Sequence, residues 1–225
     1  MTLPGLDVIA TGQDRDVVRP EPTCPRCGGE LRAPGLWSSA WQCASHGVVA
    51  PYSVVPRPGT EGLDHVLERA KVPVWLPHPL TTGWVVSGFA YAGDDREGAR
   101  AVVSCLTGPS PLGGGSELVI VSEEPGVGLG ARHAGVAGPD PGDGFGQGPP
   151  DAKVEAAGHP TALWSLPAEG DCAVFVGEAK GHWLWALVWP ASAGVLLYDS
   201  LALQDLRDGY VEAELAFGAM SPRLS

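Results

Sequence analysis

The sequence predicts an α+β protein: a small N-terminal lobe built around a Cys/His cluster, then a mostly antiparallel β domain with one or two short helices. Two further observations support this class: short apolar runs alternate with Gly and Pro, and no repeated strand–helix–strand pattern is present. With 225 residues and a hydrophobic content of 44%, the chain can form one ordinary domain and a small appendage.

The elements follow one another in a simple order. Residues 1–20 are expected to form a flexible tail, and residues 21–56 the small lobe. A turn-rich join at 56–62 leads into the β-rich domain, 63–225, which begins with a short helix over 63–70. We expect strands near 84–91, 100–106, 117–122, 161–166, 172–178, 182–189 and 194–199, and a second short helix that begins at Ser200 and stops at Gly209.

The small lobe carries two close pairs of metal-binding residue types. Cys24 and Cys27 are separated by two residues, as are Cys43 and His46, and fifteen residues lie between the pairs. This spacing is typical of a two-knuckle tetrahedral zinc site with a Cys3His ligand set. It predicts a zinc ribbon that holds one structural Zn²⁺.

Two alternatives to a structural site fit the sequence less well. A thioredoxin-like redox pair needs a strand before Cys24 and a helix after Cys27, but Gly28 and Gly29 follow the pair. A catalytic zinc needs an open coordination position, which four ligands at this spacing do not leave. The intervening segment is long enough for a hairpin whose Trp37 and Trp41 are expected to cover the site.

Charge argues against several classes of partner. Residues 1–60 carry five basic and five acidic side chains, so the net charge of −12 belongs entirely to the rest of the chain. A nucleic-acid or anionic-membrane partner favours a basic surface, and the sequence has no Lys/Arg cluster. The N-terminus does not resemble a secretory signal and no apolar run is long enough for a membrane span, so we expect a cytoplasmic protein.

The longest Gly/Pro-rich segment, 125–150, is expected to be a loop. Residues 126–131 fit the text of a dinucleotide fingerprint, but the residues that follow do not continue as a helix of useful length. Arg132 and His133 are the groups of this loop that an anionic ligand would meet. A surface loop without a ligand is the alternative interpretation.

No catalytic constellation emerges elsewhere. Asp94, Asp95 and Glu97 lie in a stretch framed by glycines, which indicates a solvated hairpin turn. Residues 182–189 are apolar on both alternating faces and predict a strand buried on both sides. The remaining candidates lack the spacing or surroundings of a nucleophilic site; these are Ser110, Cys105, Cys172, His159, His182 and Asp199.

Several stretches resemble an uncharacterised actinobacterial protein family from Glu21 to the C-terminus, including "EPTCPRCGGELRAPGLWSSAWQC", "VPVWLPHPLTTGW", "AGDDREGARA", "EEPGVGLGARHAG", "WLWALVWP" and "AMSPRLS". The resemblance implies a cytoplasmic protein whose function is unknown. Some members of that family carry a phosphotransacetylase label, but this chain is short for such an enzyme and has no recognisable acetyl-phosphate site.

Together these features favour a non-enzymatic binding or regulatory module that acts through protein contacts. The expected contact is the apolar face of the ribbon at Leu36, Trp37 and Trp41, which a lobe of this size cannot bury by itself. The alternative is an enzyme or small-anion-binding protein in which the 125–150 loop closes over a cleft, with Arg132, His133 and Asp95 as polar groups. A nucleic-acid-binding ribbon is a third hypothesis, which the charge disfavours. The sequence does not specify an oligomeric state.

Overall fold

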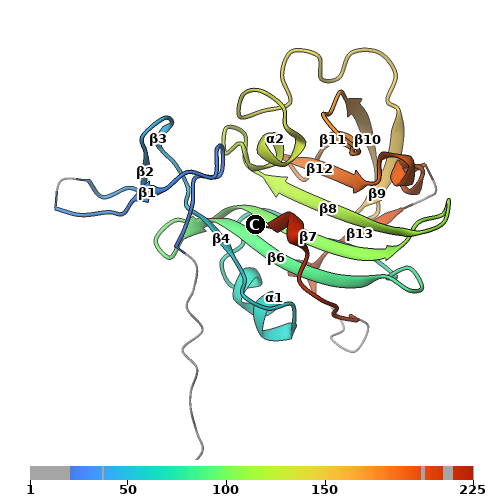
Figure 1. Ribbon diagram of the computed structural model, residues 1–225, viewed down its shortest axis with the longest axis horizontal. Coiled ribbons are helices and arrows are strands. Elements are labelled where there is room, and N and C mark those ends of the chain that lie inside the picture. Colours follow the sequence, from blue (N-terminus) through green and yellow to red (C-terminus); the bar gives the residue numbers. More distant parts are fainter. Residues whose placement is uncertain (1–20, 37, 199–200, 210–214, 225) are drawn as a thin grey trace, which may run out of the picture.

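The computed structural model describes residues 21–36, 38–198, 201–209 and 215–224 and contains two β-sheets (Figure 1). The smaller sheet is antiparallel and consists of β1 (Leu31–Arg32), β2 (Gln42–Cys43) and β3 (Gly47–Val48). This sheet carries the Cys/His cluster and projects from one side of the larger sheet. We call this part of the chain, residues 21–48, the ribbon.

The larger sheet has ten strands in the order β4-β6-β7-β8-β12-β11-β10-β9-β13-β5. All neighbouring strands are antiparallel except β13 and β9, which are parallel. The strand bounds are β4 (Tyr52–Val54), β5 (Trp75–Pro77), β6 (Val85–Asp94), β7 (Gly98–Pro109), β8 (Gly115–Glu123), β9 (Ala152–Ala156), β10 (His159–Leu166), β11 (Ala173–Ala179), β12 (His182–Trp189) and β13 (Ala202–Asp205). The mostly antiparallel fold class predicted from the sequence is confirmed.

Side chains on both faces of this sheet are buried. In β12, Leu184 and Val188 belong to one hydrophobic core, whereas Trp185 and Leu187 belong to the other. This confirms the sequence-based expectation of a strand buried on both faces.

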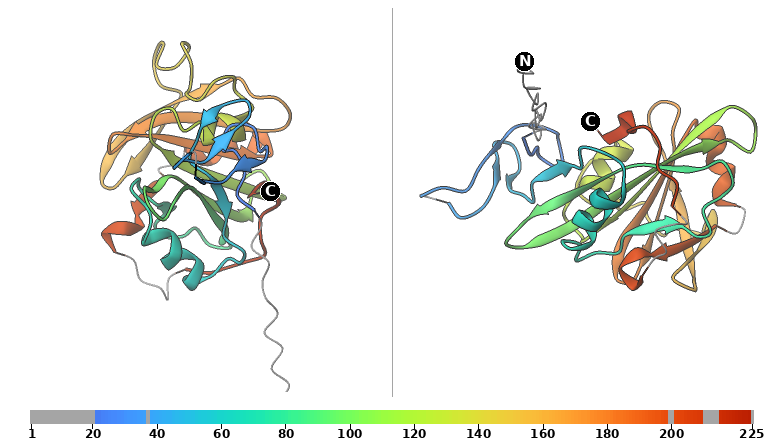
Figure 2. Two further views of the ribbon diagram at one scale, coloured as in Figure 1. Left: turned by 90° about the vertical axis from the view of Figure 1, so that its left-hand side faces the viewer. Right: turned by 90° about the horizontal axis from the view of Figure 1, so that it is seen from below.

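Each core is covered by one short helix (Figure 2). α1 (Thr60–Leu67) contributes Leu63 and Val66 to the first core, and α2 (Leu129–Ala134) contributes Leu129 to the second. The short C-terminal 3-10 turn η4 (Pro222–Leu224) adds Leu224 to the second core. The ribbon attaches on the side of the sheet that α2 covers.

Several predicted elements are confirmed and two are wrong. The strands expected between 84 and 189 are present, and the first helix begins three residues earlier than predicted, at Thr60. The strand expected at 194–199 is wrong, because residues 191–197 form a 3-10 helix, η1 (Ala191–Leu197), packed on β11 and β12. The helix expected after Ser200 is also wrong: β13 and the 3-10 turn η2 (Leu206–Asp208) lie there.

The other predictions concern the tail, the end of the small lobe and the long loop. Residues 1–20 and Ser200 lie outside the described residues. Residues 52–54, at the end of the expected small lobe, form β4 of the large sheet, and the 125–150 segment contains α2. Among the described residues, none of the helices has the length and apolar character required to cross a bilayer.

Candidate metal centre

The four residues singled out by spacing come together in space. The ligand atoms of Cys24, Cys27, Cys43 and His46 all lie within 4.8 Å of one another. Nδ1 of His46 is 3.5 Å from the sulfurs of both Cys24 and Cys43, and the sulfurs of Cys27 and Cys43 are 3.8 Å apart. The last distance excludes a disulfide, whose sulfurs lie about 2.05 Å apart. The cluster could hold a metal ion.

Two similar turns position the ligands. In the first, the amides of Arg26 and Cys27 donate to the sulfur of Cys24, and in the second those of Ser45 and His46 donate to Cys43. In each turn, the amides that point at the first cysteine therefore come from the residues two and three positions after it. Such bonds favour the thiolate, which is the form that binds a metal.

Each turn ends on a glycine with left-handed backbone. Gly28 has φ +71° and Gly47 has φ +69°, a region that costs glycine little and other residues more. The amide of Gly28 donates to the carbonyl of Cys24 over 2.8 Å and closes the first turn. The glycines flanking the two pairs in the sequence therefore have a conformational role.

The two buried cysteines differ in acidity. Burial raises the pKa of the Cys24 thiol to about 11. The backbone amide of Ser45 is the main group that lowers the pKa of Cys43, to about 6. Of these two thiols, Cys43 is therefore the more acidic.

The apolar side chains packed against this cluster are those of Leu31 and Val49. Trp41, which the sequence analysis expected to cover the metal, is half-buried and lines a neighbouring cleft. Leu36 is 99% exposed in the loop between β1 and β2. Trp37 lies outside the described residues.

Two arginines bond the ribbon to the β domain. One belongs to the ribbon and reaches the β domain, and the other belongs to the β domain and reaches the ribbon. Arg26, between the first two ligands, donates to the carbonyls of Gly126 and Val127. Arg132 of α2 donates to the carbonyl of Cys24 over 3.3 Å. These contacts join segments about a hundred residues apart in the chain.

A glycine makes room for each arginine. A Cβ on Gly28 would lie 2.8 Å from the Arg132 guanidinium, and one on Gly128 would lie 2.9 Å from the Arg26 side chain. Both glycines also have left-handed backbone. We call Arg26, Arg132, Gly28 and Gly128 the arginine latch.

Arg132 and His133, the groups proposed for a ligand loop, are thus placed at the ribbon's attachment. The Arg132 guanidinium stacks 5.3 Å above the ring of Tyr52, which also meets the His133 ring edge-on. Burial lowers the pKa of His133 to about 4, and its Nε2 has no hydrogen-bond partner among the described residues. Asp95 is in the β6–β7 turn and pairs with Arg69.

Glu123, on β8, is a buried residue that the sequence analysis missed. Its carboxylate accepts the amides of Leu129 and Gly130, over 2.7 and 3.1 Å, and so anchors the start of α2. Burial raises the pKa of Glu123 to about 7 despite these two donors. An apolar run that ends in Glu-Glu was the only signal for it in the sequence.

The rest of the 125–150 segment is held to the sheet. Asp140 accepts the amide of Gly126 and the indole N–H of Trp183, over 2.8 and 2.9 Å. Phe145 packs edge-on against Trp164 and Trp183. This segment therefore contributes to the structure that supports α2 and, through it, the ribbon.

Comparison with known proteins identifies the class to which this ribbon-bearing β protein belongs. Residues 18–224 match the Family of unknown function (DUF6758), and the chain belongs to that family. The family match agrees with the resemblance seen from Glu21 to the C-terminus. The searches of curated proteins and of solved structures gave no match.

Proposed function

We propose that the Cys3His cluster binds one structural Zn²⁺ and that the protein is a non-enzymatic binding module whose ribbon contacts a partner protein. The observation that supports the metal most directly is the set of ligand distances. Zn–S bonds of about 2.3 Å and Zn–N bonds of about 2.0–2.1 Å in a tetrahedron require S···S separations of about 3.8 Å and S···N separations of about 3.5 Å. Three of the six ligand pairs have these separations, 3.8 Å between the sulfurs of Cys27 and Cys43 and 3.5 Å from His46 to those of Cys24 and Cys43, and all six lie within 4.8 Å.

A structural role fits the ligand set. Four protein ligands complete a tetrahedral shell, so no position is left for substrate or for an activated water. Bound there, zinc would link the two knuckles and hold Arg26 and the Cys24 carbonyl in the positions that the arginine latch uses. Because thiolate ligands must stay reduced, we place the protein in the cytoplasm.

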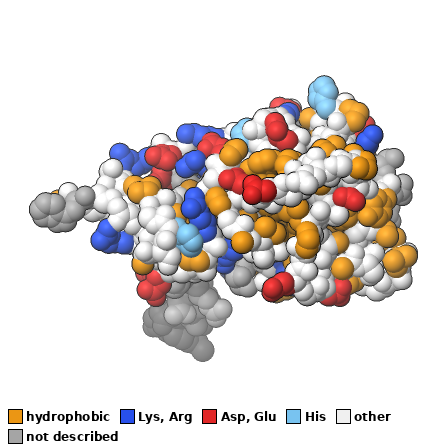
Figure 3. All heavy atoms as spheres, turned by 90° about the horizontal axis from the view of Figure 1, so that it is seen from above, with side chains coloured by type: hydrophobic (Ala, Val, Ile, Leu, Met, Phe, Trp, Pro, Cys, Tyr) orange, Lys and Arg blue, Asp and Glu red, His pale blue; other side chains and the backbone are white. Residues whose placement is uncertain are grey.

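A binding role is supported by the position of the β1–β2 loop. Figure 1 shows this loop extending away from both sheets, and Leu36 within it is fully exposed. Two adjacent large apolar residues, Leu36 and Trp37, stand in the sequence of this loop, and an apolar patch formed by them would be available for a protein contact. Figure 3 adds that Lys and Arg side chains lie mostly over the ribbon, whereas acidic side chains are spread over the β domain in that view.

Partner contact can be tested with the zinc-loaded full chain. Leu36→Asp and Trp37→Asp should abolish the recovery of a specific partner from lysate, because a charge on the loop opposes burial of the contact. Leu112→Asp is the matched control, since Leu112 is 67% exposed in the β7–β8 turn. Equal recovery by all three variants would contradict the proposed contact.

A further inference from the structure

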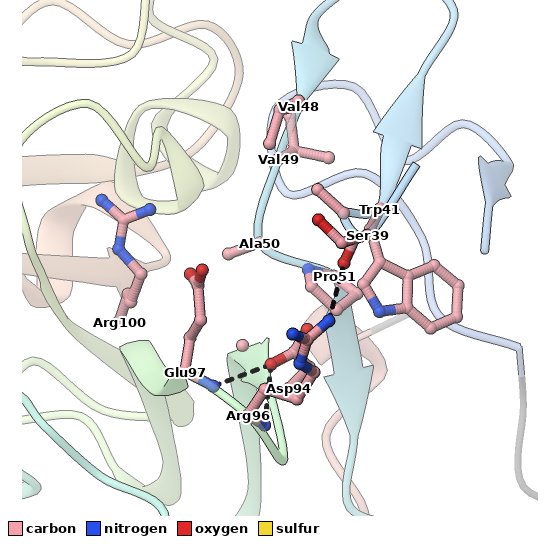
Figure 4. Close-up of a pocket in the computed structure, with 12 residues that line it drawn as sticks. Ser39, Trp41, Val48, Val49, Ala50, Pro51, Asp94, Arg96, Glu97 and Arg100 are labelled. Atoms are coloured by element: carbon pink, nitrogen blue, oxygen red, sulfur yellow. Dashed lines mark hydrogen bonds between the residues drawn. The ribbon is translucent and has the colours of Figure 1, made fainter. Parts of the chain in front are cut away.

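A cleft of about 270 Å³ lies where the ribbon meets the β6–β7 turn (Figure 4). One wall comes from the ribbon and the segment leaving it, and the other from the turn and the start of β7. The lining residues are Ser39, Ala40, Trp41, Val48, Val49, Ala50, Pro51, Gly93, Asp94, Arg96, Glu97 and Arg100. Neither part of the chain forms this cleft alone.

The two walls differ in character. The ribbon wall presents the apolar side chains of Trp41, Val48 and Ala50, of which Val48 is 65% exposed. The opposite wall presents all four charged groups of the cleft. A volume of about 270 Å³ falls below the roughly 300–1,000 Å³ of pockets for drug-sized ligands, so the cleft suits one side chain better than a nucleotide.

Three of the four charged groups already have partners. Asp94 accepts the amides of Arg96 and Glu97 over 3.0 and 2.9 Å. Arg96 donates to the Ser39 carbonyl over 3.2 Å, which also ties the turn to the ribbon. Arg100 pairs with Glu124 over 2.7 Å.

Glu97 is the exception. Its carboxylate has no hydrogen-bond or ion-pair partner among the described residues, and Figure 4 shows its side chain extending toward Ala50 on the ribbon wall. Arg100 is neutralised by Glu124, and the charges of Asp94 and Arg96 cancel, so Glu97 leaves the cleft one negative charge, which faces an apolar wall (Figure 4). This arrangement matches a group with an aliphatic stem and a single positive end.

We propose that the cleft binds a lysine side chain of the partner protein, with the stem against Trp41, Val48 and Ala50 and the ammonium on Glu97. A lysine presents one compact charge, as the single free carboxylate requires, and four methylenes that cover apolar surface. The net charge of −12 also attracts a basic partner over long range. This inference rests on the proposed binding role and names the chemistry that the contact recognises.

The test is an NMR titration of the zinc-loaded full chain with Nα-acetyl-lysine methylamide. Saturable shifts are expected for the amides of 39–41, 48–50 and 93–97, and the uncharged norleucine analogue should bind about two- to fivefold more weakly, as expected for one exposed ion pair. Glu97→Gln should weaken lysine binding by about the same factor. Asp95→Asn is the matched control, because Asp95 is on the same turn but pairs with Arg69.

Several results would overturn the inference. These are equal binding of the norleucine analogue, unchanged binding by Glu97→Gln, or absence of saturable shifts at the cleft. Zinc content and the effect of Leu36→Asp on partner recovery are measured on the same preparations. If both behave as proposed while lysine binding fails, only the inference about the cleft is wrong.

Discussion

Replacing Arg132 with alanine should weaken zinc binding although Arg132 is not a ligand. Arg132 donates to the carbonyl of Cys24, and its guanidinium stacks on Tyr52. The Cys24 carbonyl lies in the turn that the Gly28 amide closes, and the proposed metal would hold the same turn through Cys24 and Cys27. On that proposal, docking of the ribbon and metal binding are thermodynamically coupled.

The size of the effect follows from the contacts that are lost. A hydrogen bond from a charged donor contributes about 1.5–3 kcal/mol, and a partly exposed cation–π contact about 0.5–1 kcal/mol. The low end applies, because the hydrogen bond is 3.3 Å long and Arg132 is only half-buried. The hydrogen bond alone, at its low end of about 1.5 kcal/mol, corresponds to a roughly tenfold weaker zinc affinity, which is the smallest effect expected.

A competition titration against a chromogenic chelator measures this affinity directly. Arg69→Ala is the control, because Arg69 bonds Asp95 and the His65 carbonyl and has no hydrogen bond or ion pair to a described residue of the ribbon. The expected order is unchanged affinity for Arg69→Ala and about tenfold weaker binding for Arg132→Ala. An Arg132→Ala affinity within twofold of the parent would refute the coupling between latch and metal.

Two further predictions concern the β domain. Although burial raises the pKa of Asp205, hydrogen bonds from Arg207 and Lys180 lower it from 3.8 to about 2, so Asp205→Asn should cost about 2.5 kcal/mol at pH 7 in urea unfolding. Because the folded-state pKa is depressed, this stability is present above about pH 4 and the difference between the proteins should shrink as the pH falls toward 2; a constant difference would contradict the ion-pair account. Gly130→Ala should destabilise the fold by about 1–3 kcal/mol, since a Cβ there would lie 2.3 Å from the buried Trp185 ring. Gly144→Ala, with open space around it, should be near neutral in the same thermal melt, and equal effects of the two substitutions would contradict the close packing of α2.

The Cys/His cluster could be predicted from the sequence, because tetrahedral coordination by two tight turns imposes a fixed spacing on the ligands. The central strands could also be predicted, because their position in the fold imposes a pattern of apolar residues. Residues 183–189 are apolar at every position, and a strand between two cores needs that pattern.

The elements that were missed depend on distant partners. The apolar run at 195–197 has the composition of a strand, but it forms part of a 3-10 helix that packs against β11 and β12. β13 contains Asp205, whose buried charge hides the strand pattern and is balanced by Lys180, 25 positions away. The arginine latch likewise joins residues about a hundred positions apart, and local sequence carries no signal for such a pairing.

X-ray absorption at the zinc edge, with metal analysis of the purified full chain, tests the central claim most directly. One zinc per chain is expected, with three sulfur ligands at about 2.3 Å and one nitrogen ligand at about 2.0 Å. Cys27→Ala should lose this signal, because Cys27 supplies one of the three sulfurs. A chain purified with iron, with no metal, or with zinc in a shell of oxygen ligands would contradict the account.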